Sequence, residues 1–349
     1  MNWIRTAPLS ACIAALLTMV GPQAALAATV SLTTDGTIRF TARPGERNDL
    51  KLGFGRDIVS FSDTGAGVMA GQGCVAVRAN VATCPNEYRP TGSAVELRLG
   101  DRDDTLEFDD CWGDRRPITV WGSRGDDRMV LGACNGLDLT AHGGAHDDYI
   151  EAWTNWGGMN RLHGDDGRDI LRVTEGGNAR LYGGPNHDTL SWNSSIFDSQ
   201  PPTAYVQAYG DAGNDSFSPA FGSYSLETIR GGRGRDALYG GAQADEGFPF
   251  VFDFATCPEC SLETVHGSRY ADVIVGDERS NTIYAGGGND TIDGRGGKDT
   301  IYAGDGDDTV TATDGMYDVI RCGAGSFDAL FADRRESIGE CELIRRPAL

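Results

Sequence analysis

Near the C-terminus an acidic or amide side chain recurs every nine residues, at Asp272, Asn281, Asp290, Asp299 and Asp308. A glycine-rich hexad precedes each of these residues, and an aliphatic residue follows two positions later. Calcium accepts roughly six to eight oxygen ligands, from carboxylates and backbone carbonyls alike. Glycines let a turn reach positive φ and direct its carbonyl groups inward. The pattern therefore predicts a row of calcium-binding turns.

Regular spacing of this kind predicts a chain that coils with the same period. If two nine-residue units make one coil, turns eighteen residues apart stack on one edge. Asp272 then aligns with Asp290 and Asp308, and Asn281 aligns with Asp299. A single turn supplies too few ligands, so each ion is shared between neighbouring turns. The aliphatic residues point between two sheets and form a stacked ladder.

Residues 267–310 resemble the RTX, or hemolysin-type, calcium-binding repeat. The units that carry the resemblance are GSRYADVIV, GDERSNTIY, AGGGNDTID, GRGGKDTIY and AGDGDDTVT. The resemblance implies an all-β fold, a parallel β-roll or β-helix solenoid, with Ca²⁺ as its cofactor. The metal-binding positions that it implies here are Asp272, Asn281, Gly286, Gly288, Asp290, Gly296, Asp299, Gly304, Asp305, Gly306 and Asp308.

A looser form of the repeat occupies residues 95–241. Its turns end at Asp104, Asp127, Asp148, Asp169, Asp188, Asp215 and Asp236, with spacings of 23, 21, 21, 19, 27 and 21 residues. We predict one full coil per motif and metal binding along one edge, whereas residues 267–310 bind along both edges. Two residues after the acids stand the inward side chains Leu106, Met129, Ile150, Leu171, Leu190, Phe217 and Leu238.

The remaining segments frame this solenoid. Residues 1–27 have one positive charge, a short apolar run and an Ala-Leu-Ala end, which predicts a cleavable secretory signal. Residues 28–94 predict an N-terminal β cap, in which Asn48-Asp49-Leu50 is a faint first turn. Residues 242–264 predict an insert packed against the stack, 265–320 the regular β-roll, and 321–349 a C-terminal cap.

Nine cysteines include Cys12, which leaves with the predicted signal, so an even number remains for an oxidising compartment. They fall in close sequential pairs: Cys74 with Cys84, Cys111 with Cys134, Cys257 with Cys260, and Cys322 with Cys341. Nearest-neighbour pairing is a hypothesis, because many connectivities satisfy eight cysteines. The segment that contains the last pair resembles the cysteine-paired closure of secreted bacterial proteins with these repeats, which implies that this pair closes the C-terminal cap.

The formal net charge of −21 argues against nucleic acid or anionic membranes as partners. After the predicted signal, no apolar stretch is long enough to span a bilayer, so we expect no membrane insertion. The acids lie at fixed distances from glycines, which favours a cation binder over a merely acidic protein. We therefore expect calcium ions as partners and a secreted, extracellular or surface-associated protein.

The sequence contains neither a Gly-x-Ser-x-Gly nor a His-Glu-x-x-His motif. Five histidines lie in or beside the turns and could form a transition-metal or acid–base site, although solvent-facing turn positions explain them equally well: His142, His146, His163, His187 and His266. Five tryptophans could stack on sugars or fill the core: Trp112, Trp121, Trp153, Trp156 and Trp192.

We expect no enzyme, but a secreted calcium-binding protein that folds on Ca²⁺ binding and has a structural or ligand-binding role. Its candidate target is a cell-surface or extracellular glycan. The alternatives are a β-helix lyase or epimerase acting on polysaccharide, which needs clustered carboxylates outside the turns, and an adhesin or surface-layer component.

Overall fold

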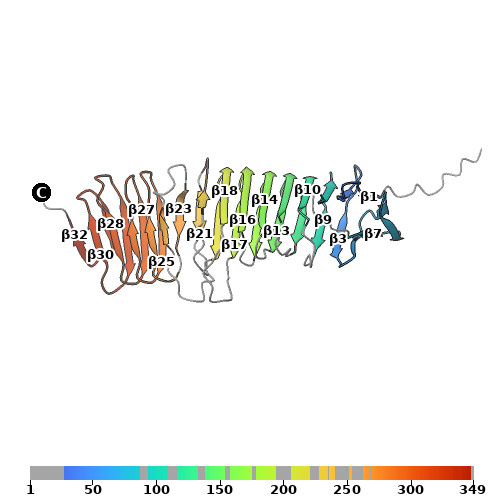
Figure 1. Cartoon of the computed structure of the whole chain (residues 1–349). Coiled ribbons are helices and arrows are strands. Elements are labelled where there is room, and N and C mark those ends of the chain that lie inside the picture. The colour runs from blue at the N-terminus through green and yellow to red at the C-terminus, as the bar shows by residue number, and fades with distance from the viewer. Residues whose placement is uncertain are drawn as a thin grey trace, which may run out of the picture.

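The computed structural model describes residues 27–86, 93–108, 116–132, 138–153, 158–174, 178–193, 206–220, 228–234, 236–239, 251–253, 262–267 and 269–346. Within these ranges every regular element is a β-strand, and the strands wind into a long solenoid (Figure 1). The first strand and the last strand lie at opposite ends of it. The predicted all-β solenoid is therefore confirmed. No helix able to cross a bilayer occurs in the described ranges.

One sheet, which we call sheet B, runs along the whole solenoid. In spatial order its strands are β6 (Val75–Arg78), β7 (Val81–Pro85), β4 (Ile58–Asp63), β3 (Asp49–Phe54), β9 (Thr105–Phe108), β11 (Arg128–Leu131), β13 (Tyr149–Trp153), β15 (Ile170–Thr174), β17 (Thr189–Asn193), β19 (Ser216–Ala220), β21 (Asp236–Tyr239), β23 (Leu262–His266), β25 (Thr282–Gly287), β27 (Thr300–Asp305), β29 (Val319–Ala324) and β31 (Ser337–Gly339). From β3 to β31 the neighbours pair in parallel.

Two further sheets complete the coils. Sheet A comprises β5 (Val68–Ala70), β1 (Ala28–Leu32), β2 (Ile38–Thr41), β8 (Val95–Gly100), β10 (Ile118–Arg124), β12 (Leu139–Ala145), β14 (Met159–Asp166), β16 (Asn178–Pro185), β18 (Val206–Ala212) and β20 (Thr228–Arg230). Sheet C comprises β22 (Val251–Asp253), β24 (Val273–Val275), β26 (Thr291–Asp293), β28 (Thr309–Ala312), β30 (Ala329–Ala332) and β32 (Leu343–Arg345). Along the chain, sheet C succeeds sheet A as the partner of sheet B.

The strand register confirms the predicted coil lengths. In sheet C, Ile274 pairs with Ile292 and Ile292 with Val310, each eighteen residues apart, so two nine-residue units make one coil. In the looser region Met129 pairs with Leu106 and Ile150, so one motif makes one coil. Strands in adjacent coils are thus in register although the connections differ in length.

The predicted inward ladder forms the core. Its members are at most 1% exposed: Leu106, Met129, Ile150, Leu171, Leu190, Phe217, Leu238, Ile274, Ile283, Ile292, Ile301 and Val310. All of them belong to one apolar cluster that runs through the solenoid. Because strand side chains alternate between faces, the residues beside them point outward. Burial of one stripe per strand therefore stabilises the stack, together with the backbone hydrogen bonds between parallel strands of adjacent coils.

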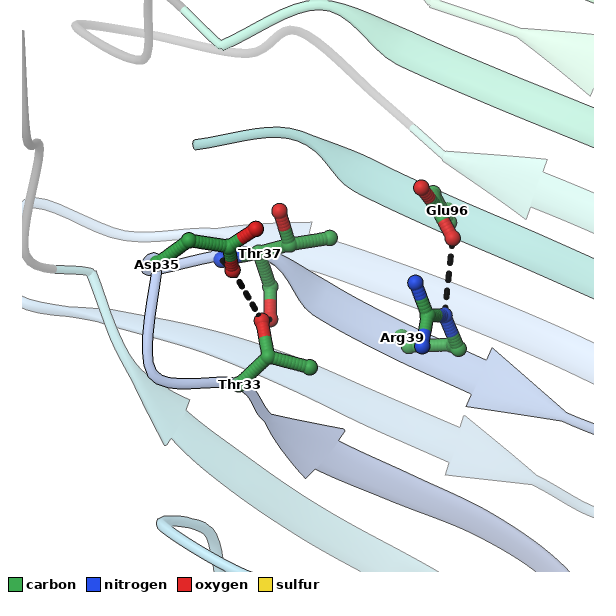
Figure 2. A network of polar contacts seen from close by, with 5 residues as sticks. All are labelled: Thr33, Asp35, Thr37, Arg39 and Glu96. Atoms are coloured by element: carbon green, nitrogen blue, oxygen red, sulfur yellow. Dashed lines mark hydrogen bonds and ion pairs between the residues drawn. The ribbon is translucent and has the colours of Figure 1, made fainter. Parts of the chain in front are cut away.

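The N-terminal cap is built from antiparallel strands, as β1 pairs with β2 and β4 pairs with both β3 and β7. Such a cap covers the end that a parallel stack would leave open. The predicted Cys74–Cys84 disulfide joins the segment before β6 to β7. Figure 2 shows the link to the first coil, where Arg39 of β2 pairs with Glu96 of β8 at 2.7 Å, and the Thr33–Asp35 hydrogen bond in the preceding turn.

The predicted Cys322–Cys341 disulfide closes the opposite end and joins β29 to the segment after β31. The other two predicted cysteine pairs, Cys111 with Cys134 and Cys257 with Cys260, lie outside the described residues. So does the predicted signal, apart from Ala27.

The segment expected to be an insert, 242–264, contributes strands to the solenoid where it is described. Val251–Asp253 forms β22, which pairs in parallel with β24 and begins sheet C. Leu262–His266 forms β23, which continues sheet B across a register shift at Asp236/Ala237. Irregular spacing hid these strands from the repeat pattern, because β22 lies 22 residues from its partner in β24, and Val265 of β23 lies 27 residues from its partner Leu238 in β21.

Replacing Leu171 with alanine should lower the free energy of unfolding by about 2–5 kcal/mol, because it opens a cavity in the closed core. Leu171 is fully buried, whereas its neighbour Ile170 is 43% exposed on the outer face. Urea unfolding in millimolar calcium measures the loss, with Ile170→Ala as the matched control. Equal losses in both variants would contradict the proposed direction of the ladder.

Candidate metal centre

The predicted turn acids form a single row along the edge of the solenoid that precedes sheet B. In each step the backbone N–H of one acid donates to Oδ1 of the acid in the next coil, as from Asp104 to Asp127 at 2.8 Å and from Asp127 to Asp148 at 2.8 Å. The structure brings together in this way Asp104, Asp127, Asp148, Asp169, Asp188, Asp215 and Asp236. Asn281 and Asp299 precede β25 and β27 on the same edge and make the same contact at 2.9 Å.

A second row lies on the edge that precedes sheet C. The N–H of Asp272 donates to Asp290 Oδ1, and the N–H of Asp290 donates to Asp308 Oδ1, both at 2.8 Å. The expected alignment of these three residues is therefore confirmed. In the described residues the Asp-ended row thus runs along one edge in the looser region and along both edges in the regular region.

The structure adds residues that the repeat pattern missed. Asp318 and Asp328 extend the two rows, accepting from the N–H groups of Asp299 and Asp308. Each is followed by an aliphatic residue two positions later, so this signal was present, but the spacing slips to nineteen and twenty residues. Asn48, in the suspected faint turn, begins the row by donating to Asp104 Oδ1 at 2.6 Å.

Glutamates end both stretches of aspartates. Glu263 Oε2 accepts the N–H of Asp236, and Glu342 Oε2 accepts the N–H of Asp328, both at 2.9 Å. Neither glutamate stands at a repeat position, so no sequence signal identified them. The glutamate side chain is longer than that of aspartate, so it can accept from the backbone N–H of the preceding aspartate at a place where the regular repeat stops.

The second carboxylate oxygen of most row members is buried and has no hydrogen-bond partner. This holds for Oδ2 of Asp104, Asp127, Asp148, Asp169, Asp188, Asp215, Asp290, Asp299, Asp308, Asp318 and Asp328. The residues themselves are at most 2% exposed. A buried carboxylate oxygen without a donor or cation is costly. Asn281 differs, because its Oδ1 accepts the N–H of Asp277 at 3.1 Å.

The first glycine of each turn leaves room for these oxygens. A Cβ built on Gly143 would lie 2.3 Å from Asp148 Oδ2 and 2.7 Å from the carbonyl oxygen of Gly164 in the next coil. Any side chain there would overlap both atoms. Carboxylate and carbonyl oxygens of neighbouring coils converge in this way beside Gly122, Gly143, Gly164 and Gly210, and both are acceptors that a cation can bridge.

The later glycines allow the turns to stack. Gly286, Gly288, Gly304 and Gly306 have φ between 108° and 138°, a range that only glycine adopts readily. A Cβ on Gly306 would overlap the carbonyl oxygen of Gly288 in the preceding coil, and one on Gly296 would meet the Glu278 side chain. Asp305 is exposed and lies outside the buried row, and its carbonyl accepts the N–H of Gly288.

Burial raises the pKa of the row members far above that of a free carboxyl, and like charges in the row add to the effect. The pKa rises to about 8 for Asp127, Asp188 and Asp290 and to about 6 for Asp169. It rises to about 7 for Asp104, Asp148, Asp215 and Asp299. The backbone hydrogen bond to each Oδ1 opposes this rise without cancelling it. The row therefore binds either protons or a cation near neutral pH.

Ca²⁺ fits this donor set. It is a hard cation that takes carboxylate and backbone carbonyl oxygens in flexible geometry. The rows offer only oxygens, and neighbouring coils contribute to the same space. Ion binding would neutralise carboxylates that otherwise repel one another across adjacent turns.

Without divalent cations, we expect the stability of the chain to fall as pH rises. An aspartate whose pKa is higher in the folded state than its ordinary 3.8 binds more protons when folded. This contribution is complete below about pH 4 and is lost as pH rises through the folded values near 7 to 8. Thermal unfolding in chelator at pH 5 and pH 8.5 tests the direction, with calcium-loaded protein as the control. Greater stability of the chelated chain at pH 8.5 would refute it.

Comparison with known protein families gives one finding. The RTX calcium-binding nonapeptide repeat matches in four copies, at residues 157–190, 221–246, 266–301 and 275–310. These ranges cover part of both rows, and no curated protein matches the chain. RTX nonapeptide repeats bind Ca²⁺ in a β-roll, in agreement with the turn geometry described above. The chain is an RTX-type calcium-binding repeat protein.

Proposed function

We propose that this chain is a secreted protein that folds when its turns bind Ca²⁺ outside the cell and then serves a structural or surface-binding role. The observation that supports the proposal best is the row of buried carboxylate oxygens without partners. Such a row is unfavourable in the charged state unless a cation occupies it. The folded state and the ion-bound state are therefore closely linked.

We propose that the ligands come from both rows. The proposed set is Asp104, Asp127, Asp148, Asp169, Asp188, Asp215, Asp236, Asp272, Asn281, Gly286, Gly288, Asp290, Gly296, Asp299, Gly304, Asp305, Gly306 and Asp308. The aspartates of the buried rows would supply carboxylate oxygens and the glycines carbonyl oxygens. We add Asp318 and Asp328, because each has the same buried free oxygen.

Calcium concentration would set the folding equilibrium. Extracellular calcium modules have dissociation constants of about 10⁻⁴ to 10⁻³ M, so they bind little ion at cytosolic concentrations. A site at tenfold excess of ion stabilises the folded chain by about 1.4 kcal/mol if the unfolded chain does not bind. Several such sites in one solenoid add to a large fraction of the stability of a domain.

We expect the mature chain to lose most of its β-sheet signal in chelator and to regain it in millimolar calcium. Clustered carboxylates repel one another, and glycine-rich turns lose much entropy on ordering, so the ion-free chain is disfavoured. Far-UV circular dichroism at pH 7.5 measures the change, with magnesium at equal concentration as the control. A full β-sheet spectrum in chelator would count against coupled folding.

The double variant Asp290→Ala/Asp308→Ala should bind at least one calcium ion fewer than the parent chain. Both residues lie in the row before sheet C, and each has a buried Oδ2 without a partner. Calorimetry or native mass spectrometry counts the ions. The control is Asp138→Asn, which removes a carboxylate that is 57% exposed and pairs with Arg161. Unchanged stoichiometry in the double variant would exclude these ligands.

We propose an extracellular glycan as the class of surface partner. Outward rings of sheet B support this choice, since Tyr239, Tyr284 and Tyr302 are 39–41% exposed. Together with His266 these rings stack face to face at 4.7–4.9 Å. Because the faces are covered, a glycan would meet ring edges and hydroxyl groups. Hydrogen bonding, rather than stacking on an open ring face, would then dominate recognition.

A further inference from the structure

The outer face of sheet A carries a second stack of rings, formed by Trp121, His142, His163, Tyr182 and Tyr209 on successive coils. Ring centroids of His142 and His163 are 4.5 Å apart, and those of His163 and Tyr182 are 4.6 Å apart. The parallel register explains this, because His142 pairs with His163 and His163 with Tyr182. These two histidines therefore belong to strands, and the structure holds their imidazoles side by side.

Asp165 brings a carboxylate to the same place. It follows His163 by two residues on β14, so both side chains leave the same face of the sheet. Its Oδ2 lies 3.2 Å from His142 Nδ1 in the neighbouring coil. Asp165 has a φ of 67°, in a turn position that glycine fills in several other coils. An acid at this position thus points along the ring stack.

Two glycines keep the space around Asp165 open. Gly144 is its partner in β12, and Gly184 lies against its backbone from the other side. Neither can cover the carboxylate with a side chain. A hollow of about 370 Å³ results, and His163, Asp165, Tyr182 and Pro185 contribute to its walls. His163 and Asp165 are therefore accessible to a small ligand from the hollow, and the His142 side chain beside them is 30% exposed.

One potential ligand atom from each of His142, His163 and Asp165 lies within 4.8 Å of the other two. This is the one such group of three His, Cys, Asp or Glu side chains in the described part of the chain. A tetrahedral ion at about 2.0–2.1 Å from its ligands needs ligand atoms roughly 3.3 Å apart. A modest rotation of each imidazole ring about its terminal torsion would bring the ligand atoms from within 4.8 Å of one another to the shorter separation that the ion needs.

We propose that His142, His163 and Asp165 form a binding site for a divalent transition metal of the zinc class, separate from the calcium rows. Imidazole nitrogens suit zinc and its neighbours, whereas calcium takes oxygen ligands. The site lies on the outer face of sheet A, and the calcium-binding oxygens lie inside the turns. An ion held here would link β12 to β14 across adjacent coils. Its remaining coordination position would face the hollow.

The contact between His142 and Asp165 has a second explanation, a hydrogen bond or ion pair that involves no metal. The two explanations differ in what they require of His163. A metal site needs its ring nitrogen, whereas an ion pair between His142 and Asp165 needs only its ring as a stacking neighbour. Substitutions that keep a ring in the stack but remove the nitrogen therefore separate them.

The test titrates Zn²⁺ into the full mature chain saturated with calcium, by calorimetry, with Co²⁺ absorption as a second readout of nitrogen ligation. We expect one zinc ion at this site. The variants His142→Phe and His163→Phe keep an aromatic ring in the stack, and Asp165→Asn tolerates positive φ. Each should weaken zinc binding by roughly tenfold or more. Circular dichroism in calcium and a calcium count verify that the solenoid is intact.

The matched control is His266→Phe, which alters a histidine stacked between Tyr239 and Tyr284 in the other ring stack. This variant should bind zinc at the proposed site as the parent does. The proposal fails if the calcium-loaded parent binds no zinc ion with one-to-one stoichiometry. It also fails if His163→Phe binds as tightly as the parent, or if His266→Phe loses as much affinity, since zinc would then bind adventitiously to surface histidines.

Discussion

Neutralisation of buried carboxylates between stacked turns is the constraint on which the solenoid depends. Parallel coils are about 4.8 Å apart, so one aspartate per turn places like charges at that spacing inside the protein. A backbone N–H donates to one oxygen of each carboxylate and leaves the other without a partner, as at Asp127 and Asp290. Glycines such as Gly143 exist to leave room for that free oxygen. A cation bound between the turns would neutralise these carboxylates.

The row of aspartates is longer than the family match alone indicates. The match begins at residue 157 and ends at residue 310, whereas the row before sheet B begins at Asn48 and includes Asp318, and the row before sheet C extends to Asp328. Coils of about 21 residues and coils of eighteen residues both contribute to the row before sheet B, because sheet B continues through both regions across the register shift at Asp236/Ala237. Connections on the opposite edge absorb the difference in length. The aspartate at the edge therefore recurs in successive coils even where the number of residues per coil changes.

The outer faces follow a different rule from the edges. Parallel register places identical positions of successive coils side by side, so outward rings stack into ladders. In sheet A the ladder includes His142 and His163, and the turn at Asp165 adds a carboxylate to it. A solenoid can thus carry calcium inside its turns and different chemistry on its faces. The parallel register aligns both the aspartates in the turns and the rings on the outer faces.

The coil period, the inward ladder and the alignment of residues such as Asp272, Asp290 and Asp308 could be predicted from the sequence. In a chain with a fixed repeat, residues one period apart in the sequence lie side by side in adjacent coils. These features therefore follow from the spacing alone. The folded arrangement, in contrast, was needed to see that Val251–Asp253 begins a new sheet, that Glu263 accepts from Asp236 and Glu342 from Asp328, and that Asp165 reaches His142. These depend on connections of irregular length and on contacts between coils, which no local period encodes.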